Sequence, residues 1–301
     1  MKFVFHDNTW GGWSASFRRS FLTRGFEPCN LAHDALYDAK RIDEPLMFFQ
    51  HWNAAQTKLL RRPRTAPVGA YVHCLTDFPF TVGFRPRGPG EVEALRRFDH
   101  LFVALDCYAD HMVAGGVPSE KVHVVGYPME WEEVAAESTF PKHENTGCIA
   151  SRLDPDNHPF IAAQILHESC LESPAYFSTN GMLTNPFTQA AAELGFSRLA
   201  PETRRRFLRM MSQSEWLVSA TAGESFGCLY MEAEALGVKV CAPRSPGLTE
   251  LYEESSLYPQ YHIPNAVRRI NDGEPARLRS HVRIRHSADS VVAHIRSILE
   301  A

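Results

Sequence analysis

The strongest constraint on the fold is the repeated alternation of short apolar runs with longer segments of helical period. In the first half of the chain the short runs are rich in Val, Phe and Ile. The expected strands are residues 2–5, 46–49, 68–74, 100–105 and 121–125. Strands that alternate with helices in this way are typical of β-α units built around a parallel sheet.

The helical segments of the first half lie between these strands. Residues 14–24 place Phe17, Phe21 and Leu22 on one helical face and are followed by Gly25, a residue that favours helix C-termini. Two further short helices are expected over residues 91–98 and 108–114. A polar, strand-poor stretch over residues 130–145 then separates two halves of similar length and is the expected linker.

The second half repeats the alternation. Its expected strands are residues 148–151, 176–178, 216–220 and 239–242, and its expected helices are residues 159–168, 187–194, 202–211 and 226–236. A last segment, residues 286–299, has apolar side chains at helical spacing and should pack on one domain or bridge both. We therefore expect two doubly wound α/β domains: residues 1–138 with the C-terminal helix 286–301, and residues 139–285.

The composition fits two domains without covalent cross-links. The 301 residues carry 31 basic and 35 acidic side chains, a net charge of −4, so the chain as a whole should not attract nucleic acid or anionic membranes. No apolar run approaches the roughly 20 residues of a membrane span, and the first residues enter a strand-like run, which predicts a cytoplasmic protein. The seven cysteines are scattered singly, which favours free thiols over disulfides or a zinc site.

The stretch most informative about function is GESFGCLYMEAEALG, residues 223–237, which follows the apolar run WLVSA. A strand, a turn of small residues and a helix form an anion site in outline, because the first backbone N–H groups of a helix lack intrahelical partners. Glu224 lies in the turn and Glu232 lies eight residues later, so the two carboxylates could face one elongated polar ligand from the same side.

This stretch resembles the E-G-F-G-x-x-x-x-E signature of retaining nucleotide-sugar glycosyltransferases of the two-Rossmann-domain (GT-B) kind, family 4-like. Glu224 and Glu232 match its two glutamates, and Ser225 replaces its first glycine. A second piece, ASRLDPDNHP over residues 150–159, is similar to the family's G-R-L-x-x-x-K-G turn. Arg152 matches the arginine, and Asn157 stands at the lysine position. The resemblance implies two Rossmann-like domains that face each other across a cleft, with the C-terminal helix packing back.

The resemblance also implies roles for individual residues. Residues 139–285 would bind the donor, with Arg152 on its diphosphate, Glu232 on its ribose hydroxyls and Glu224 on the sugar. His158 could supply part of the missing lysine charge. The remaining donor contacts would come from Asn157, Ser225, Phe226, Gly227 and Cys228. Catalysis, assigned to Glu224, Arg152 and His73, would consist mostly of positioning and stabilisation of the departing negative charge.

In the first half the resemblance is more general. HDNTWGGW, residues 6–13, resembles the family's first glycine-containing loop, where Gly11 and Gly12 would approach the donor. Tyr71-Val72-His73 resembles the family's strand that ends in a histidine near the donor sugar, and His51 is the competing candidate. The ends of strands are where open α/β sheets bind ligands.

We expect no metal and no permanently bound cofactor. Asp154-x-Asp156 imitates the D-x-D metal site of other glycosyltransferases, but it lies beside Pro155, and we interpret it as turn chemistry. The expected donor is a nucleotide sugar, preferably a UDP-sugar such as UDP-glucose.

The acceptor could be a glycan, a small molecule or modified DNA. The densest basic segment of the first half is KLLRRPR, residues 58–64; its Arg61, Arg62 and Arg64, with His51 and Trp52 nearby, could hold a phosphate-bearing acceptor. Two alternatives remain: a phage-type enzyme that glycosylates hydroxymethylated pyrimidine in DNA in the host cytoplasm, and a non-catalytic nucleotide- or sugar-binding protein of the same fold.

Overall fold

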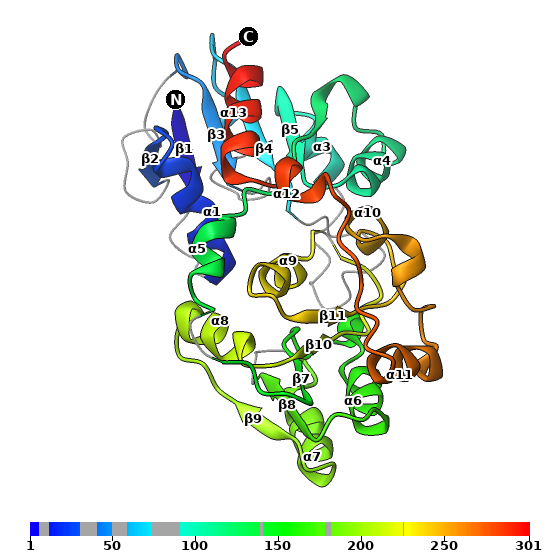
Figure 1. The fold of residues 1–301 in the computed structure, drawn as a ribbon. Coiled ribbons are helices and arrows are strands. Elements are labelled where there is room, and N and C mark those ends of the chain that lie inside the picture. Colours follow the sequence, from blue (N-terminus) through cyan, green and yellow to red (C-terminus); the bar gives the residue numbers. More distant parts are fainter. Residues whose placement is uncertain are drawn as a thin grey trace. The chain divides into compact units, whose positions relative to one another are not determined.

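The computed structural model describes residues 1–5, 12–30, 41–49, 59–73, 91–138, 141–177, 182–224 and 226–301. The described chain divides into two compact units (Figure 1). Unit 1 combines residues up to Glu130 with Arg283–Ala301, and unit 2 comprises Trp131–Val282.

Unit 1 is built on a six-stranded, all-parallel sheet of order β2-β1-β3-β4-β5-β6. Its strands are β1 (Lys2–Phe5), β2 (Glu27–Asn30), β3 (Leu46–Phe49), β4 (Val68–Tyr71), β5 (His100–Val103) and β6 (Val122–Val124). Strands β3 and β4 are buried along their whole length, as strands covered on both faces of a parallel sheet must be.

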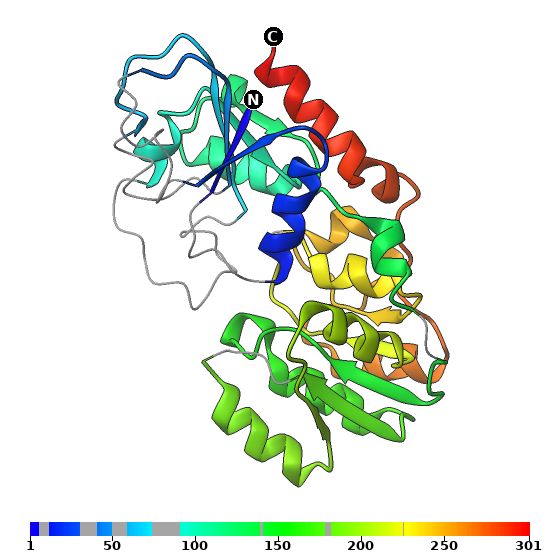
Figure 2. The ribbon, with the colours of Figure 1, turned by 90° about the vertical axis from the view of Figure 1, so that its left-hand side faces the viewer.

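The helices of unit 1 are α1 (Gly12–Leu22), α3 (Glu91–Leu95), α4 (Asp106–Ala114) and α13 (Ala288–Leu299), which follows the short α12 (Val282–Arg285). Helix α1 packs through aromatic rings: the centroid of Phe17 lies 4.6 Å from that of Tyr71, and Phe21 stacks on Phe3 at 4.9 Å. Helix α13 contacts α1 and β5 (Figure 2), and Asp289 pairs with Arg24 at 2.7 Å. The C-terminal helix therefore packs back onto unit 1.

Unit 2 has a five-stranded parallel sheet of order β11-β10-β7-β8-β9. Its strands are β7 (Thr146–Ile149), β8 (Ser173–Phe177), β9 (Ser197–Leu199), β10 (Trp216–Val218) and β11 (Lys239–Cys241). Numbered within the unit, this order is 3-2-1-4-5, the order of a Rossmann-type half.

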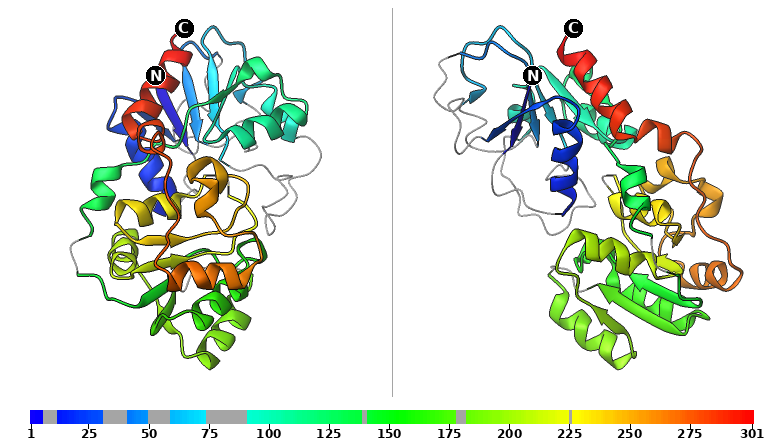
Figure 3. Two further views of the ribbon diagram at one scale, coloured as in Figure 1. Left: turned by 45° about the vertical axis from the view of Figure 1, so that its right-hand side comes forward. Right: turned by 60° about the vertical axis from the view of Figure 1, so that its left-hand side comes forward.

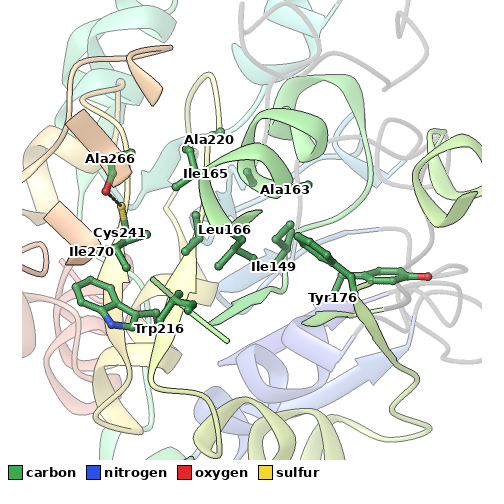
Figure 4. Close-up of a cluster of buried hydrophobic side chains, with 14 of the residues drawn as sticks. Ile149, Ala163, Ile165, Leu166, Tyr176, Trp216, Ala220, Cys241, Ala266 and Ile270 are labelled. Atoms are coloured by element: carbon green, nitrogen blue, oxygen red, sulfur yellow. Dashed lines mark hydrogen bonds between the residues drawn. The ribbon is translucent and has the colours of Figure 1, made fainter. Parts of the chain in front are cut away.

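Helices cover both faces of this sheet (Figure 3). The helices of unit 2 are α5 (Trp131–Ala135), α6 (Pro159–Glu168), α7 (Thr184–Glu193), α8 (Arg204–Ser212), α9 (Cys228–Ala235), α10 (Leu248–Leu251) and α11 (Ile263–Asn271). Ile149, Tyr176 and Trp216 pack on one face with residues of α6, α7 and α11 (Figure 4). On the other face Phe177 meets Phe207 of α8 at 4.7 Å, and α8 packs with α9.

The expected fold class, two α/β halves with parallel sheets and a C-terminal helix, is confirmed. Some expected elements need correction. The linker over residues 130–145 contains helix α5, which buries Trp131 and Val134 and packs on α9. The helix expected over residues 226–236 begins only at Cys228, because Gly227 has left-handed backbone angles. Strands β2 and β9 and helices α10, α11 and α12 were not expected.

Two further expectations concern the cysteines and the membrane. All six cysteines in the described ranges are free thiols. None of the helices in the described part of the chain is long and apolar enough to cross a bilayer.

Candidate functional site

The candidate site lies at the carboxyl ends of β7 and β10 in unit 2. After β7 the chain adds β8 and β9 on one side, and it then returns to place β10 on the other side. Such a reversal of strand order leaves a crevice beside the strand ends, and this is where open α/β sheets bind ligands. The two loops at this point, residues 150–158 and residues 219–224 with 226–227, contain the turn of the one sequence motif and the beginning of the other.

The loop after β7 is organised by Asp154. One of its carboxylate oxygens accepts the backbone N–H of Met182 at 2.9 Å, and the other pairs with Arg152 at 3.0 Å. Asp154 is buried, whereas the Arg152 side chain is 51% exposed. Asp154 therefore acts as a partner that orients the Arg152 guanidinium.

The same loop ends in a one-turn 3-10 helix, Pro155–Asn157, followed by His158 at the N-cap of α6. His158 has φ 44° and ψ 55°, the left-handed region that favours glycine, and it stands where the family signature has glycine. Its Nε2 lies 3.2 Å from the Tyr261 hydroxyl. Burial lowers the pKa of His158, which favours the neutral ring. His158 is therefore better suited to hydrogen bonding than to replacing the charge of a lysine.

The loop after β10 is fixed by backbone and hydroxyl contacts. The Thr221 hydroxyl donates to the carbonyl of Gly223 at 2.9 Å, and the N–H of Ala222 donates to the carbonyl of Asp156 at 2.8 Å. The second contact joins the two loops. Gly227, with φ 79°, then starts α9, and a Cβ at this position would lie 2.8 Å from the Tyr230 ring. A glycine is needed here for both reasons.

Glu224 lies in the loop after β10, three residues before Gly227. Burial raises the pKa of Glu224 to about 7; hydrogen bonding with Tyr230 lowers it, the charge of Asp156 raises it and the charge of Arg152 lowers it. Burial likewise raises the pKa of Asp156 to about 6, against the lowering effects of Arg152 and the backbone N–H groups of Asp156 and Asn157. Electrostatics thus couple Glu224 to the β7 loop, so the two sequence motifs come together.

Glu232 has different surroundings. It is buried in α9 and pairs with Arg204, the first residue of α8, at 2.6 Å. Burial raises the pKa of Glu232, and Arg204 lowers it. Because α9 begins only at Cys228, helical spacing does not relate Glu224 to Glu232; that both carboxylates face one ligand stays a prediction.

The other expected donor-site residues are accounted for as follows. Asn157 and Phe226 are buried, Cys228 is half-buried at the start of α9, and Ser225 lies outside the described residues. No group of three or more His, Cys, Asp or Glu side chains that could hold a metal gathers within the described ranges.

The expected residues of unit 1 are only partly described. Gly12 starts α1, and the half-buried His73 follows β4 by two residues. Arg61 is exposed and Arg62 half-buried, whereas Arg64 pairs with Asp99 at 2.8 Å and donates to the Arg97 carbonyl. Gly11, His51 and Trp52 lie outside the described residues.

Sequence reasoning missed three members of the site: Asp156, Arg204 and Tyr230. From the sequence alone, Asp156 is interpreted as part of a turn, although its position four residues after Arg152 places it in the same loop as a predicted donor contact. Tyr230 hydrogen-bonds Ser219 at 2.6 Å and reaches Glu224, a contact that only the folded loop creates.

No protein-family model matches the chain, and no curated protein matches it by sequence. Solved structures do resemble it. HepE from Anabaena, solved with UDP and glucose, has a TM-score of 0.71 at 13% identity, over 100% of this chain and 99% of that one. The lipopolysaccharide outer core galactosyltransferase WaaB has a TM-score of 0.62 at 13% identity, over 100% and 96%. The pneumococcal O-GlcNAc transferase GtfA, solved with UDP and GlcNAc, has a TM-score of 0.61 at 12% identity, over 85% and 56%.

These similarities establish a shared fold. The chain has the two-unit α/β fold of GT-B glycosyltransferases, including the C-terminal helix that packs on unit 1.

Proposed function

We propose that the chain is a retaining glycosyltransferase that moves a sugar from a UDP-sugar to an acceptor hydroxyl. The observation that carries this proposal is the convergence of Arg152, Glu224 and the N-terminus of α9 at the point where strand order reverses in unit 2. A guanidinium and helix amides suit a diphosphate, and a carboxylate suits sugar hydroxyls. The complexes of similar structures with UDP and UDP-glucose support the choice of donor.

In the proposed reaction, the bond between the anomeric carbon and the diphosphate oxygen breaks while the acceptor oxygen bonds the same carbon on the same face. The acceptor proton passes to the leaving phosphate. Arg152, oriented by Asp154, and the first amides of α9 stabilise the departing charge, so no metal is required. Unit 2 is proposed as the donor-binding unit, and unit 1, with His73, as the acceptor-binding unit.

The test is release of nucleotide from a panel of UDP-, GDP- and ADP-sugars, with and without chelator. We expect slow release from a UDP-sugar that chelator does not abolish and that Arg152→Ala reduces about ten- to a hundredfold. Arg198→Ala, in the exposed part of edge strand β9, is the matched control and should leave the rate unchanged. Binding without release under every acceptor tried would favour a non-catalytic binding protein.

The DNA-acceptor alternative rests on Arg61, Arg62 and Arg64 of the basic segment; Arg64 also pairs with Asp99, so the test replaces the other two. If DNA is the acceptor, affinity for hydroxymethylated duplex should fall steeply with salt. Replacing Arg61 and Arg62 by Ala should then flatten the log–log slope by up to about 2 units, at about 0.9 per phosphate contact. If the slope of log affinity against log salt is the same in this variant as in the wild type, the acceptor is a glycan or a small molecule.

A further inference from the structure

The two aspartates of the loop after β7 differ in how their carboxylates are satisfied. Both carboxylate oxygens of Asp154 have a partner: one accepts the N–H of Met182, and the other pairs with Arg152. Asp156 is only 7% exposed, yet its Oδ1 has no hydrogen-bond partner among the described residues. A buried carboxylate oxygen without a donor costs free energy, and in native proteins such an atom needs a reason.

The position of Asp156 suggests that reason. Its carbonyl accepts the N–H of Ala222, which fixes it against the loop that carries Glu224. The charge of Asp156 raises the pKa of Glu224, and the charge of Arg152 lowers the pKa of both carboxyl groups. Two carboxyl groups that repel each other are thus held at the ends of two neighbouring strands.

A ligand that donates several O–H hydrogen bonds would relieve both the unpaired oxygen and the repulsion. Sugars present such hydroxyl groups on adjacent carbons, and each carboxylate oxygen accepts them. An anion would be repelled by the pair, so the diphosphate must lie toward Arg152 and the helix amides.

From this geometry we infer that Asp156 is a specificity-determining residue of the donor site, whose carboxylate accepts a hydroxyl of the transferred sugar alongside Glu224. This inference rests on the proposed function. It adds a second sugar-binding carboxylate to the one implied by the sequence resemblance.

The experiment compares binding of UDP with binding of the UDP-sugar that the wild type binds most tightly, by calorimetry. In Asp156→Asn and Asp156→Ala the affinity for UDP should change less than twofold, while that for the UDP-sugar falls about ten- to a hundredfold. The control is Asp272→Asn, which removes an exposed carboxylate of unit 2 and should change neither. One of the deoxy-sugar donors lacks the hydroxyl that Asp156 is inferred to bind. The wild type should bind this donor more weakly than the full UDP-sugar, whereas Asp156→Ala should bind the two equally.

Thermal stability separates this role from a structural one. Because Oδ1 makes no hydrogen bond with any described residue, the Tm of Asp156→Asn should equal or exceed that of the wild type. A lower Tm with an unchanged ratio of the two affinities would overturn the inference and leave the proposed function in place. A wild type that binds no nucleotide and no nucleotide sugar would overturn the proposed function itself.

Discussion

Burial in the loop after β10 shifts the pKa of the Glu224 carboxyl group far from its usual range. Its ordinary pKa is 4.5, and burial raises the pKa in the folded protein to about 7. Between these values the folded state holds a proton that the unfolded state releases. This group therefore contributes stability below about pH 4.5, and the contribution is lost as the pH rises through about 7.

Glu224→Gln should remove this dependence. Relative to the variant, the wild type should lose stability steadily between about pH 4.5 and 7, a trend opposite to that of a salt-bridged carboxylate. Urea unfolding of both proteins across this range measures the difference. A stability difference that stays constant with pH would contradict the raised pKa.

The buried pair of Glu232 and Arg204 gives a prediction about stability. Arg204→Ala leaves a buried carboxylate without its partner, so the free energy of unfolding should fall by about 1 to 3 kcal/mol. The control is Arg206→Ala in the same helix, where the exposed pair with Glu202 should contribute under about 0.5 kcal/mol. Equal effects of the two substitutions in urea titrations would show that the pair is not buried in solution.

At the scale of elements, the start of α6 depends on one unusual backbone conformation. A left-handed residue other than glycine costs roughly 1 to 2 kcal/mol, and a β-branched residue fits worst. His158→Gly should therefore be more stable than His158→Val by at least about 1 kcal/mol. At the exposed His167 in the last turn of the same helix the order should reverse, because glycine weakens an ordinary helical position. Chemical unfolding of the four variants tests both orders.

The packing of α13 on the sheet of unit 1 requires a strand residue without a side chain. A Cβ on Gly69 would lie 2.5 Å from the Phe102 ring and 3.1 Å from the Leu299 side chain. Gly69→Ala should therefore destabilise unit 1 by about 1 to 3 kcal/mol. In a double-mutant cycle, Gly69→Ala should cost less free energy of unfolding when Phe102→Leu is also present. If the effects of the two substitutions simply add, the strain does not come from the Phe102 ring.

For the whole molecule, the alternation of apolar runs was sufficient to predict two parallel α/β units. The central strands are apolar because both of their faces are covered, so β1 and β3 were predicted at their observed bounds. Two of the edge strands lack that signal: β2 contains Pro28, and β9 is mostly exposed. The motifs around Arg152 and Glu224 identified the candidate site, but the Asp156 Oδ1 that no described residue satisfies and the Glu232 pair depend on tertiary contacts.

Ligand binding should be visible in only one of the two units. If UDP occupies the proposed donor site, hydrogen exchange should slow in residues 150–158 and 219–232. At a hundredfold excess over Kd the linked stabilisation is about 2.7 kcal/mol. Peptides from β4 and β5 of unit 1 serve as the internal control, and Arg152→Ala should reduce the protection at the same UDP concentration. Uniform protection of both units would argue against a donor site confined to unit 2.

The chain path has a consequence for biosynthesis. Unit 1 begins the chain, but α13 belongs to it, and the bridge of Met129 to Ser287 joins its two segments. At about 5 to 20 residues per second, translation of Trp131–Val282 separates these segments by roughly 8 to 30 s. During that interval the face of β5 that receives α13 stays uncovered, while unit 2, whose described residues all lie within Trp131–Val282, can complete its core first. The first half to be synthesised is therefore the last to finish folding.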